Sequence, residues 1–217
     1  MDGVQMTNMH AEYSRNAREL AELVGPIRTV GLTGGIASGK TVAATALARA
    51  GYNIVDADEI SRRLTARGTK AERDICALFP GVGKDGTLDR KKLRDVIASN
   101  VSDRRKLEEY THPLIIAEIK NALSVGNKNV LAAPLLFETA LARFCDCTVC
   151  VTCPRAIRIQ RIAERDKVTS EQAERIIDAQ IPDLYRATLA SFCVPSDVGK
   201  AAFESEIVAL FDAIFVK

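Results

Sequence analysis

Residues 34–41 read Gly-Gly-Ile-Ala-Ser-Gly-Lys-Thr, which fits a phosphate-binding loop: a glycine, any four residues, then glycine, lysine and a hydroxyl residue. Small residues let successive backbone N–H groups turn toward phosphate oxygens, and the helix that follows directs the positive end of its dipole at them. In such a loop Lys40 neutralises the outer phosphates, and Thr41 gives its hydroxyl to a magnesium ion. The motif therefore predicts a nucleoside triphosphate as the ligand.

A second group of candidates is Asp56-Ala57-Asp58, at the end of an expected strand. Ligands of a parallel sheet bind beyond the carboxyl ends of its strands, so Asp58 is expected beside the phosphate loop. A carboxylate there can orient an attacking hydroxyl and accept its proton, or hold magnesium through water. The alternative is that Asp58 only caps the next helix. Both interpretations stay open on these residues alone.

A third group is Arg158, Arg161 and Arg165, whose spacing of three and then four places them on one helical face. Phosphoryl transfer spreads negative charge over oxygens, and guanidinium groups on a closing segment can stabilise that charge. A solvated basic face is the alternative. Given the phosphate loop, we expect at least one of Arg161 and Arg165 to act in the reaction.

The elements that would position these residues alternate between short apolar runs and helix-like stretches, which predicts an α/β fold with a parallel sheet. The phosphate loop joins a strand to a helix, as its motif requires. We expect strands at 27–32, 53–55, 129–133 and 147–152, with the helix after the loop at 41–50.

A long, mostly helical tract separates the second and third expected strands. It contains one amphipathic helix at 88–99 and another that continues after Pro113, where the proline is expected to interrupt the helix. Further along, Thr169 and Gln172 form a capping-box pattern that opens a helix running toward Gln180. The helical tract is a candidate region for binding the second substrate.

The composition is ordinary for a globular protein: 217 residues, 47% hydrophobic and 27% charged, with a formal net charge of +2. This length suits one domain, and the small net charge argues against a general nucleic-acid or membrane surface. Residues 1–25 mix acidic and basic side chains without a long apolar run, so they resemble neither a signal peptide nor a membrane span. We expect a cytoplasmic protein of unpredicted oligomeric state.

Four of the six cysteines, Cys145, Cys147, Cys150 and Cys153, fall within nine positions and raise the alternative of a metal cluster. We favour a buried strand instead, because side chains alternate along a strand and four such thiolates cannot converge on one zinc ion. Disulfides are not expected in a reducing compartment.

Together these motifs resemble the dephospho-CoA kinase family, over most of residues 28–180. The phosphate loop is shared by many kinases, but the other matching segments, in this order, are more specific. The matching segments are GLTGGIASGKT at 31–41, VDAD at 55–58 with Arg62, GTLDR at 86–90, His112-Pro113, PLLFE at 134–138, Arg161 with Arg165-Asp166, and Gln180.

The resemblance implies a P-loop three-layer α/β sandwich with a parallel five-stranded sheet, a helical substrate-binding region and a lid. It implies an enzyme that transfers the γ-phosphoryl group of ATP, with Mg²⁺, to the 3′-hydroxyl of dephospho-CoA, the last step of coenzyme A synthesis. The expected parts are an N-terminal extension at 1–26 and a kinase domain at 27–217, with the CoA-side region at about 60–127 and the lid at about 155–190.

The resemblance also assigns residues. Asp58 would act at the acceptor hydroxyl, and Arg161 and Arg165 would belong to the lid side of the nucleotide site. His112 has the alternative of simply packing or capping at Pro113. The expected ATP-binding residues are Gly34, Gly35, Ile36, Ala37, Ser38, Gly39, Lys40, Thr41 and Val42, the expected substrate-binding residues are Asp58, Arg62, His112, Leu135 and Leu136, and the catalytic set is Asp58, Lys40, Arg161 and Arg165.

The chain departs from the family pattern at three places. Ser191 and Ser196 stand where the family usually has an aspartate before the last strand and an asparagine after it, near adenine. Ala132 stands where the family usually has an aspartate, so magnesium would depend on Thr41, phosphates, water and Asp58.

The alternatives are another P-loop small-molecule or nucleotide kinase, a GTPase-like switch, and a homologue that binds nucleotide or CoA without turnover. Asn127-Lys128 superficially resembles a guanine-reading motif, but Val130 stands where its aspartate is expected.

Overall fold

The computed structural model describes residues 27–84, 87–123 and 128–215. The chain divides into two compact units, one made of the chain up to Ile54 together with Gly126 onward, the other of Val55–Val125. We call these the sheet unit and the helical unit. The expected N-terminal extension at 1–26 lies outside the described residues.

The main sheet has the strand order β2-β5-β1-β6-β7. β1 pairs in parallel with both β5 and β6, and β6 pairs in parallel with β7. The prediction of an α/β fold with a parallel five-stranded sheet is therefore confirmed. The strands are β1 (Thr29–Thr33), β2 (Asn53–Asp56), β5 (Asn129–Ala132), β6 (Cys147–Thr152) and β7 (Phe192–Pro195).

The central strand β1 is buried along its whole length, from Thr29 to Thr33. A strand covered on both faces reads as a continuous buried run rather than an alternating one, which is why its sequence shows no period of two. Its carboxyl end leads directly into the phosphate loop, so the loop begins in the middle of the sheet.

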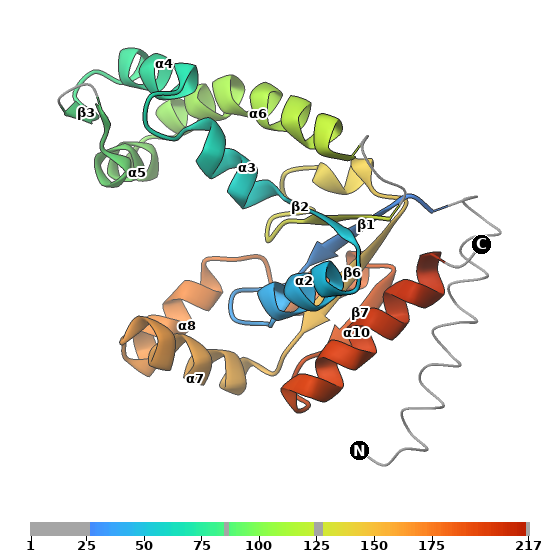
Figure 1. Ribbon diagram of the computed structural model, residues 1–217. Coiled ribbons are helices and arrows are strands. Elements are labelled where there is room, and N and C mark those ends of the chain that lie inside the picture. The colour runs from blue at the N-terminus through green and yellow to red at the C-terminus, as the bar shows by residue number, and fades with distance from the viewer. Residues whose placement is uncertain (1–26, 85–86, 124–127, 216–217) are drawn as a thin grey trace. The chain divides into compact units, whose positions relative to one another are not determined.

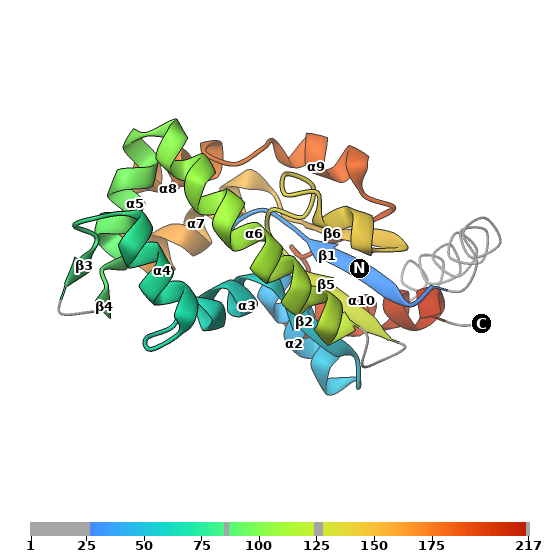
Figure 2. The ribbon, with the colours of Figure 1, turned by 90° about the horizontal axis from the view of Figure 1, so that it is seen from above.

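Helices cover both faces of this sheet. α2 packs against α10 on one face, and α9 packs against β6 on the other (Figure 2). α7 and α8 lie side by side (Figure 1). The main core includes Leu32, Leu47, Val149 and Phe211, all fully buried. The helices are α2 (Lys40–Arg49), α7 (Arg155–Asp166), α8 (Ser170–Asp178), α9 (Asp183–Leu189) and α10 (Lys200–Phe215), with a short 3-10 helix at Leu141–Phe144.

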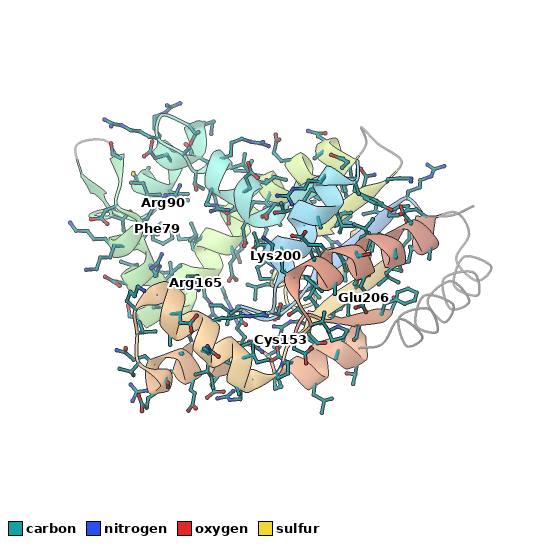
Figure 3. All side chains as sticks on the ribbon, turned by 60° about the horizontal axis from the view of Figure 1, so that its bottom comes forward. Phe79, Arg90, Cys153, Arg165, Lys200 and Glu206 are labelled. Atoms are coloured by element: carbon teal, nitrogen blue, oxygen red, sulfur yellow. The ribbon has the colours of Figure 1, made fainter. Side chains whose placement is uncertain are left out.

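The helical unit has its own core of Ile75, Phe79, Val82, Leu88 and Leu93. Phe79 is labelled in Figure 3. The antiparallel pair β3–β4 was not predicted, because strands of two residues show no periodicity. The elements are α3 (Ala57–Leu64), α4 (Lys70–Leu78), β3 (Gly83–Lys84), β4 (Thr87–Leu88), α5 (Arg90–Ser99) and α6 (Val101–Leu123).

Helix α6 corrects one prediction. It continues through Pro113 as a single helix of 23 residues, so the expected interruption at the proline is wrong. A proline in a helix removes one hydrogen bond and strains the preceding turn, but packing can hold the helix together. α6 packs against both α3 and α5, and this tertiary support is what the local pattern could not show.

Two helix starts follow their capping residues. Asp89 accepts hydrogen bonds from the backbone N–H groups of Lys91 and Lys92, so α5 begins at Arg90 rather than at Leu88. The Thr169 side chain and Gln172 form the predicted capping box at the start of α8. None of the described helices is long and apolar enough to cross a membrane.

Candidate functional site

The phosphate loop has the backbone form that an anion-binding turn needs. Ala37 and Gly39 adopt left-handed conformations, with φ of 60° and 103°. Residues that alternate between right- and left-handed conformations point successive N–H groups to one side, and the carbonyls then point to the other. Gly39 is also the N-cap of α2, so Lys40 and Thr41 stand at the positive end of that helix.

The outward carbonyls of the loop are held from behind by three side chains. Arg158 Nε donates to Ile36 O at 2.8 Å, and Arg161 Nη1 donates to Ala37 O at 3.0 Å. The Ser196 hydroxyl donates to Ser38 O. Three consecutive carbonyls thus have partners on the side away from the inward N–H groups, which fixes the direction of the loop.

Ser196 is buried, with 4% of its surface exposed, and follows directly after β7. Its N–H donates to Thr152 O at 2.9 Å, and its oxygens accept from Arg161, at 3.0 Å to the carbonyl and 3.3 Å to the hydroxyl. The sequence singled out this position only as a departure near adenine. The structure adds the hydrogen bond from Ser196 to the loop, which the local sequence pattern did not predict.

The three arginines on one face of α7, Arg158, Arg161 and Arg165, have different surroundings. Arg158 and Arg161 contact the phosphate loop, whereas Arg165 is exposed and makes two hydrogen bonds to Asp166, both at 2.8 Å (Figure 3). These bonds raise the pKa of Arg165 and lower that of Asp166. The structure therefore brings Arg161 to the loop but leaves Arg165 paired with its neighbour.

Arg158 belongs to a buried ionic cluster with α9. It pairs with Asp183, which also accepts from Arg186 Nη1 at 2.9 Å. Arg186 Nη2 lies 3.4 Å from Glu138 Oε1, which joins the PLLFE segment to the same cluster. Burial and the charge of Arg186 lower the pKa of Arg158. Sequence reasoning missed Arg186 and Asp183, since no motif marks either residue.

Gln180 reaches the loop from the segment between α8 and α9. Its Oε1 accepts a hydrogen bond from the N–H of Ile36 at 2.8 Å. This gives the last residue of the family resemblance a definite place at one end of the phosphate loop.

The PLLFE segment presents its two leucines differently. Leu135 is 46% exposed, whereas Leu136 is fully buried. A Cβ on Gly31 would come within 2.8 Å of Leu136 Cδ2, so Leu136 packs directly on β1. Of the two, Leu135 keeps a surface for a ligand. Ala132, at the end of β5, is fully buried and offers no metal ligand.

In the helical unit, Asp56 is the N-cap of α3. Its side chain accepts from the N–H groups of Asp58 and Glu59, at 2.9 and 3.0 Å. The alternative in which Asp58 caps this helix is therefore wrong. Asp58 stands in the first turn of α3 and is exposed. Arg62 Nε donates to its backbone oxygen at 3.3 Å.

Two other expected residues of this unit have simpler surroundings. His112 is exposed on α6. Arg90, labelled in Figure 3, donates to Thr65 O at 2.8 Å and to Thr65 Oγ1 at 3.0 Å, which ties the start of α5 to the end of α3. The GTLDR segment thus contributes its arginine to the architecture of the helical unit, while its Gly86 lies outside the described residues.

The clustered cysteines are free thiols. Cys147 and Cys150 lie in β6, which has the expected bounds of 147–152, whereas Cys145 precedes the strand and Cys153 follows it. Burial raises the pKa of Cys145, Cys147 and Cys150 to about 12 in each case. A thiol with so high a pKa stays protonated at neutral pH and is a weak nucleophile and metal ligand.

Comparison with known families identifies the same region. The family model for dephospho-CoA kinase matches residues 28–201. Dephospho-CoA kinase of Methylococcus capsulatus is 35% identical over 185 residues, which cover 83% of this chain and 93% of that protein. The enzyme of Geobacillus kaustophilus is 38% identical over 161 residues, or 71% of this chain and 80% of its own.

Solved structures agree with this match. Dephospho-CoA kinase from Campylobacter jejuni superposes with a TM-score of 0.66 at 25% identity, over 86% of this chain and 96% of that one. A shikimate kinase from Acinetobacter baumannii, in complex with shikimate, has a TM-score of 0.53 at 20% identity, over 91% and 99% of the two chains. The second likeness concerns the fold alone.

Proposed function

The chain belongs to the dephospho-CoA kinase family, and we propose that the residues described above carry out its reaction, transfer of the γ-phosphoryl group of ATP to the 3′-hydroxyl of dephospho-CoA. The observation that carries the proposal is the phosphate loop. Its left-handed residues and its outward, fully partnered carbonyls leave it shaped to receive an anion.

The loop binds the triphosphate of ATP through its backbone N–H groups, and Lys40 neutralises charge on the outer phosphates. Thr41 would hold the magnesium ion. Its side chain is exposed at the first turn of α2, and its hydroxyl makes no hydrogen bond to another described residue. With Ala132 in place of an acidic residue, phosphates and water would supply the remaining oxygen ligands, and the bound ion would neutralise charge on the phosphates.

Asp58 is the proposed base. It follows β2 in the first turn of α3, where Asp56 already caps the helix, so its carboxylate is not needed as the cap. A carboxylate at the acceptor hydroxyl orients that hydroxyl and accepts its proton as the phosphoryl group transfers. Arg62, His112 and Leu135, all with exposed or half-exposed side chains, are proposed to contact dephospho-CoA.

The lid side is proposed to be residues 155–190, with Arg161 and Arg165. Arg165 is exposed, and its partner is an adjacent surface aspartate, so its guanidinium can turn toward a phosphate at small cost. The CoA-side region at about 60–127 corresponds closely to the helical unit. We propose a cytoplasmic location for the enzyme.

The test is a coupled ADP-release assay with ATP, Mg²⁺ and dephospho-CoA, run beside the variants Asp58→Asn and Lys40→Ala. Both variants should lose most turnover, about 100-fold or more, since each removes a charge at the reacting groups. Circular dichroism and thermal unfolding check that both remain folded.

Adenosine, shikimate and pantetheine serve as comparison acceptors. Faster turnover with one of these than with dephospho-CoA would replace the proposal with another small-molecule kinase. Full activity in Asp58→Asn would remove that residue from the mechanism.

A further inference from the structure

In the ionic cluster of Arg158, Asp183, Arg186 and Glu138, the Asp183 side chain can turn away from its partners. The guanidinium groups of Arg158 and Arg186 are buried, with 1% and 0% of their side chains exposed. The Asp183 side chain is 40% exposed and stands at the first position of α9, directly after Pro182. The carboxylate can therefore turn to solvent, whereas the two cations cannot.

This cluster lies directly on the phosphate loop. A Cβ added to Gly35 would come within 2.6 Å of both Arg158 Nη2 and Asp183 Oδ1. The next loop residue, Ile36, gives its N–H to Gln180. Side chains of residues 180–186 thus occupy one end of the loop, at the groups that a phosphate would use.

The two buried arginines have more donors than partners. Arg158 Nη2 and Arg186 Nε make no hydrogen bond within the described part of the chain, although both atoms are buried. A buried donor without a partner is costly and calls for an explanation such as a ligand that completes the site. Arg158 Nη2 is the donor beside Gly35, so it is directed at the loop.

A phosphoryl group fits these donors better than the aspartate does. It carries more negative charge than a carboxylate and offers three oxygens, which suit several guanidinium donors at once. With Asp183 turned away, Arg158 and Arg186 would face the phosphoryl group, and Glu138 would be the carboxylate that remains in the cluster. When the phosphoryl group replaces the Asp183 carboxylate, the two buried guanidinium groups keep an anionic partner. This matters because a buried charge without a partner is strongly destabilising.

We propose that Asp183 is an internal substitute for the terminal phosphoryl group of ATP. It neutralises Arg158 and Arg186 until that group arrives at the Gly35 end of the loop, and then turns to solvent while the two arginines bind the phosphoryl oxygens. The proposal rests on the proposed function only in taking ATP as the nucleotide, and it does not depend on the acceptor.

The test compares the dissociation constants of ATP and ADP, measured by calorimetry with Mg²⁺ and without an acceptor. Asp183→Asn removes the competing charge but keeps the shape, so ATP should bind about tenfold more tightly and ADP within about twofold of wild type. Arg158→Gln should weaken ATP binding by about 10- to 100-fold and ADP binding by clearly less, because both nucleotides lose the support of Ile36 O but only ATP loses the phosphoryl contact.

The matched control is Arg143→Gln, outside the lid, whose exposed guanidinium lies over the Phe144 ring. It should change neither constant. If Asp183→Asn weakens ATP binding, or if either cluster variant shifts ATP and ADP by the same factor, the cluster is purely structural and the proposal is wrong. Should Arg158→Gln fail to fold, Asp183→Asn and Asp183→Ser decide the matter between them.

The outcomes separate this proposal from the proposed function. A protein that shows these shifts in the ATP-to-ADP ratio but does not phosphorylate dephospho-CoA contradicts the proposed function alone. A protein that phosphorylates dephospho-CoA without the shifts contradicts this inference alone.

Discussion

Arg161 and Ser196 are joined by two hydrogen bonds, from Nη2 to the Ser196 carbonyl at 3.0 Å and from Nη1 to its hydroxyl at 3.3 Å. Each of the two also holds one carbonyl of the phosphate loop, Ala37 O for the arginine and Ser38 O for the serine. The loop is therefore tied to the end of β7 through one buried hydroxyl. Ala37, a non-glycine residue with φ of 60°, needs this support to keep its left-handed conformation.

The first prediction concerns Ser196→Ala. The substitution removes a donor to Ser38 O and leaves that buried carbonyl without its partner, which costs about 1–3 kcal/mol. Because the loop binds ATP, the KM for ATP should rise by about fivefold or more, while kcat changes by less than about threefold. Steady-state kinetics at saturating dephospho-CoA give both constants.

Ser191→Ala is the control for this experiment. Ser191 bonds to Thr148 between β6 and β7, away from the loop, so the KM of this variant should stay near the wild-type value. Equal effects of the two substitutions would contradict a specific role for Ser196.

Local patterns predicted the parts of this protein that depend on neighbouring residues. The phosphate loop, its helix, the capping box at Thr169 and the individual strands each depend on sequence positions close together. The contacts around the loop could not be predicted in this way, since Arg158 and Ile36 are 122 positions apart and Ser196 and Ser38 are 158 apart.

The three arginines of α7 show why the contacts that could not be predicted matter for function. Spacing placed Arg158, Arg161 and Arg165 on one helical face and suggested contacts with phosphate. In the structure two of them donate to backbone carbonyls of the loop, because those carbonyls are turned outward by the left-handed residues. A basic residue near a phosphate loop can thus support the loop through one of its donors, and only the fold shows which donors remain for an anion.

The second prediction concerns Pro113 in α6. The proline cannot donate a hydrogen bond to the preceding turn, whereas alanine can, and proline costs up to about 3 kcal/mol relative to alanine in a helix interior. Pro113→Ala should therefore raise the free energy of unfolding by about 1–3 kcal/mol. Urea unfolding followed by circular dichroism measures this change.

Thr111→Ala is a suitable comparison, since it changes the same turn without restoring a donor. The Thr111 hydroxyl donates to the Leu107 carbonyl of its own helix, so its loss should have a small effect. A destabilised Pro113→Ala protein would mean that the proline shapes α6 in a way that its neighbours require.

The third prediction follows from Glu72, which holds the β3–β4 pair to α4. Its carboxylate accepts from Leu88 N at 2.9 Å and from Gly68 N at 2.6 Å, and these bonds lower its pKa below the ordinary 4.5. A lowered pKa in the folded state means that the stabilisation is present above pH 4.5 and is lost as the pH falls through the folded-state pKa. Glu72→Gln should therefore be less stable than wild type at pH 7.

The difference between these two proteins should shrink steadily below pH 4.5, because protonation makes the wild-type side chain a neutral acid. Thermal unfolding between pH 3 and pH 7 measures it. Glu109→Gln, exposed on α6, serves as the control and should show little difference at either end. A difference for Glu72→Gln that is independent of pH would show that the charge of the carboxylate does not matter.

The fourth prediction concerns the cysteines. Burial raises the pKa of the Cys147 and Cys150 thiols to about 12, so both stay protonated at pH 8, and both side chains are buried. Cys193 is exposed on β7, although burial of its thiol also raises its pKa. Iodoacetamide at pH 8 should therefore modify Cys193 in the folded protein and leave Cys147 and Cys150 unmodified until denaturant is added. Peptide mass spectrometry over time reads out each site. Modification of Cys147 at the rate of Cys193 in the folded protein would show that β6 opens readily.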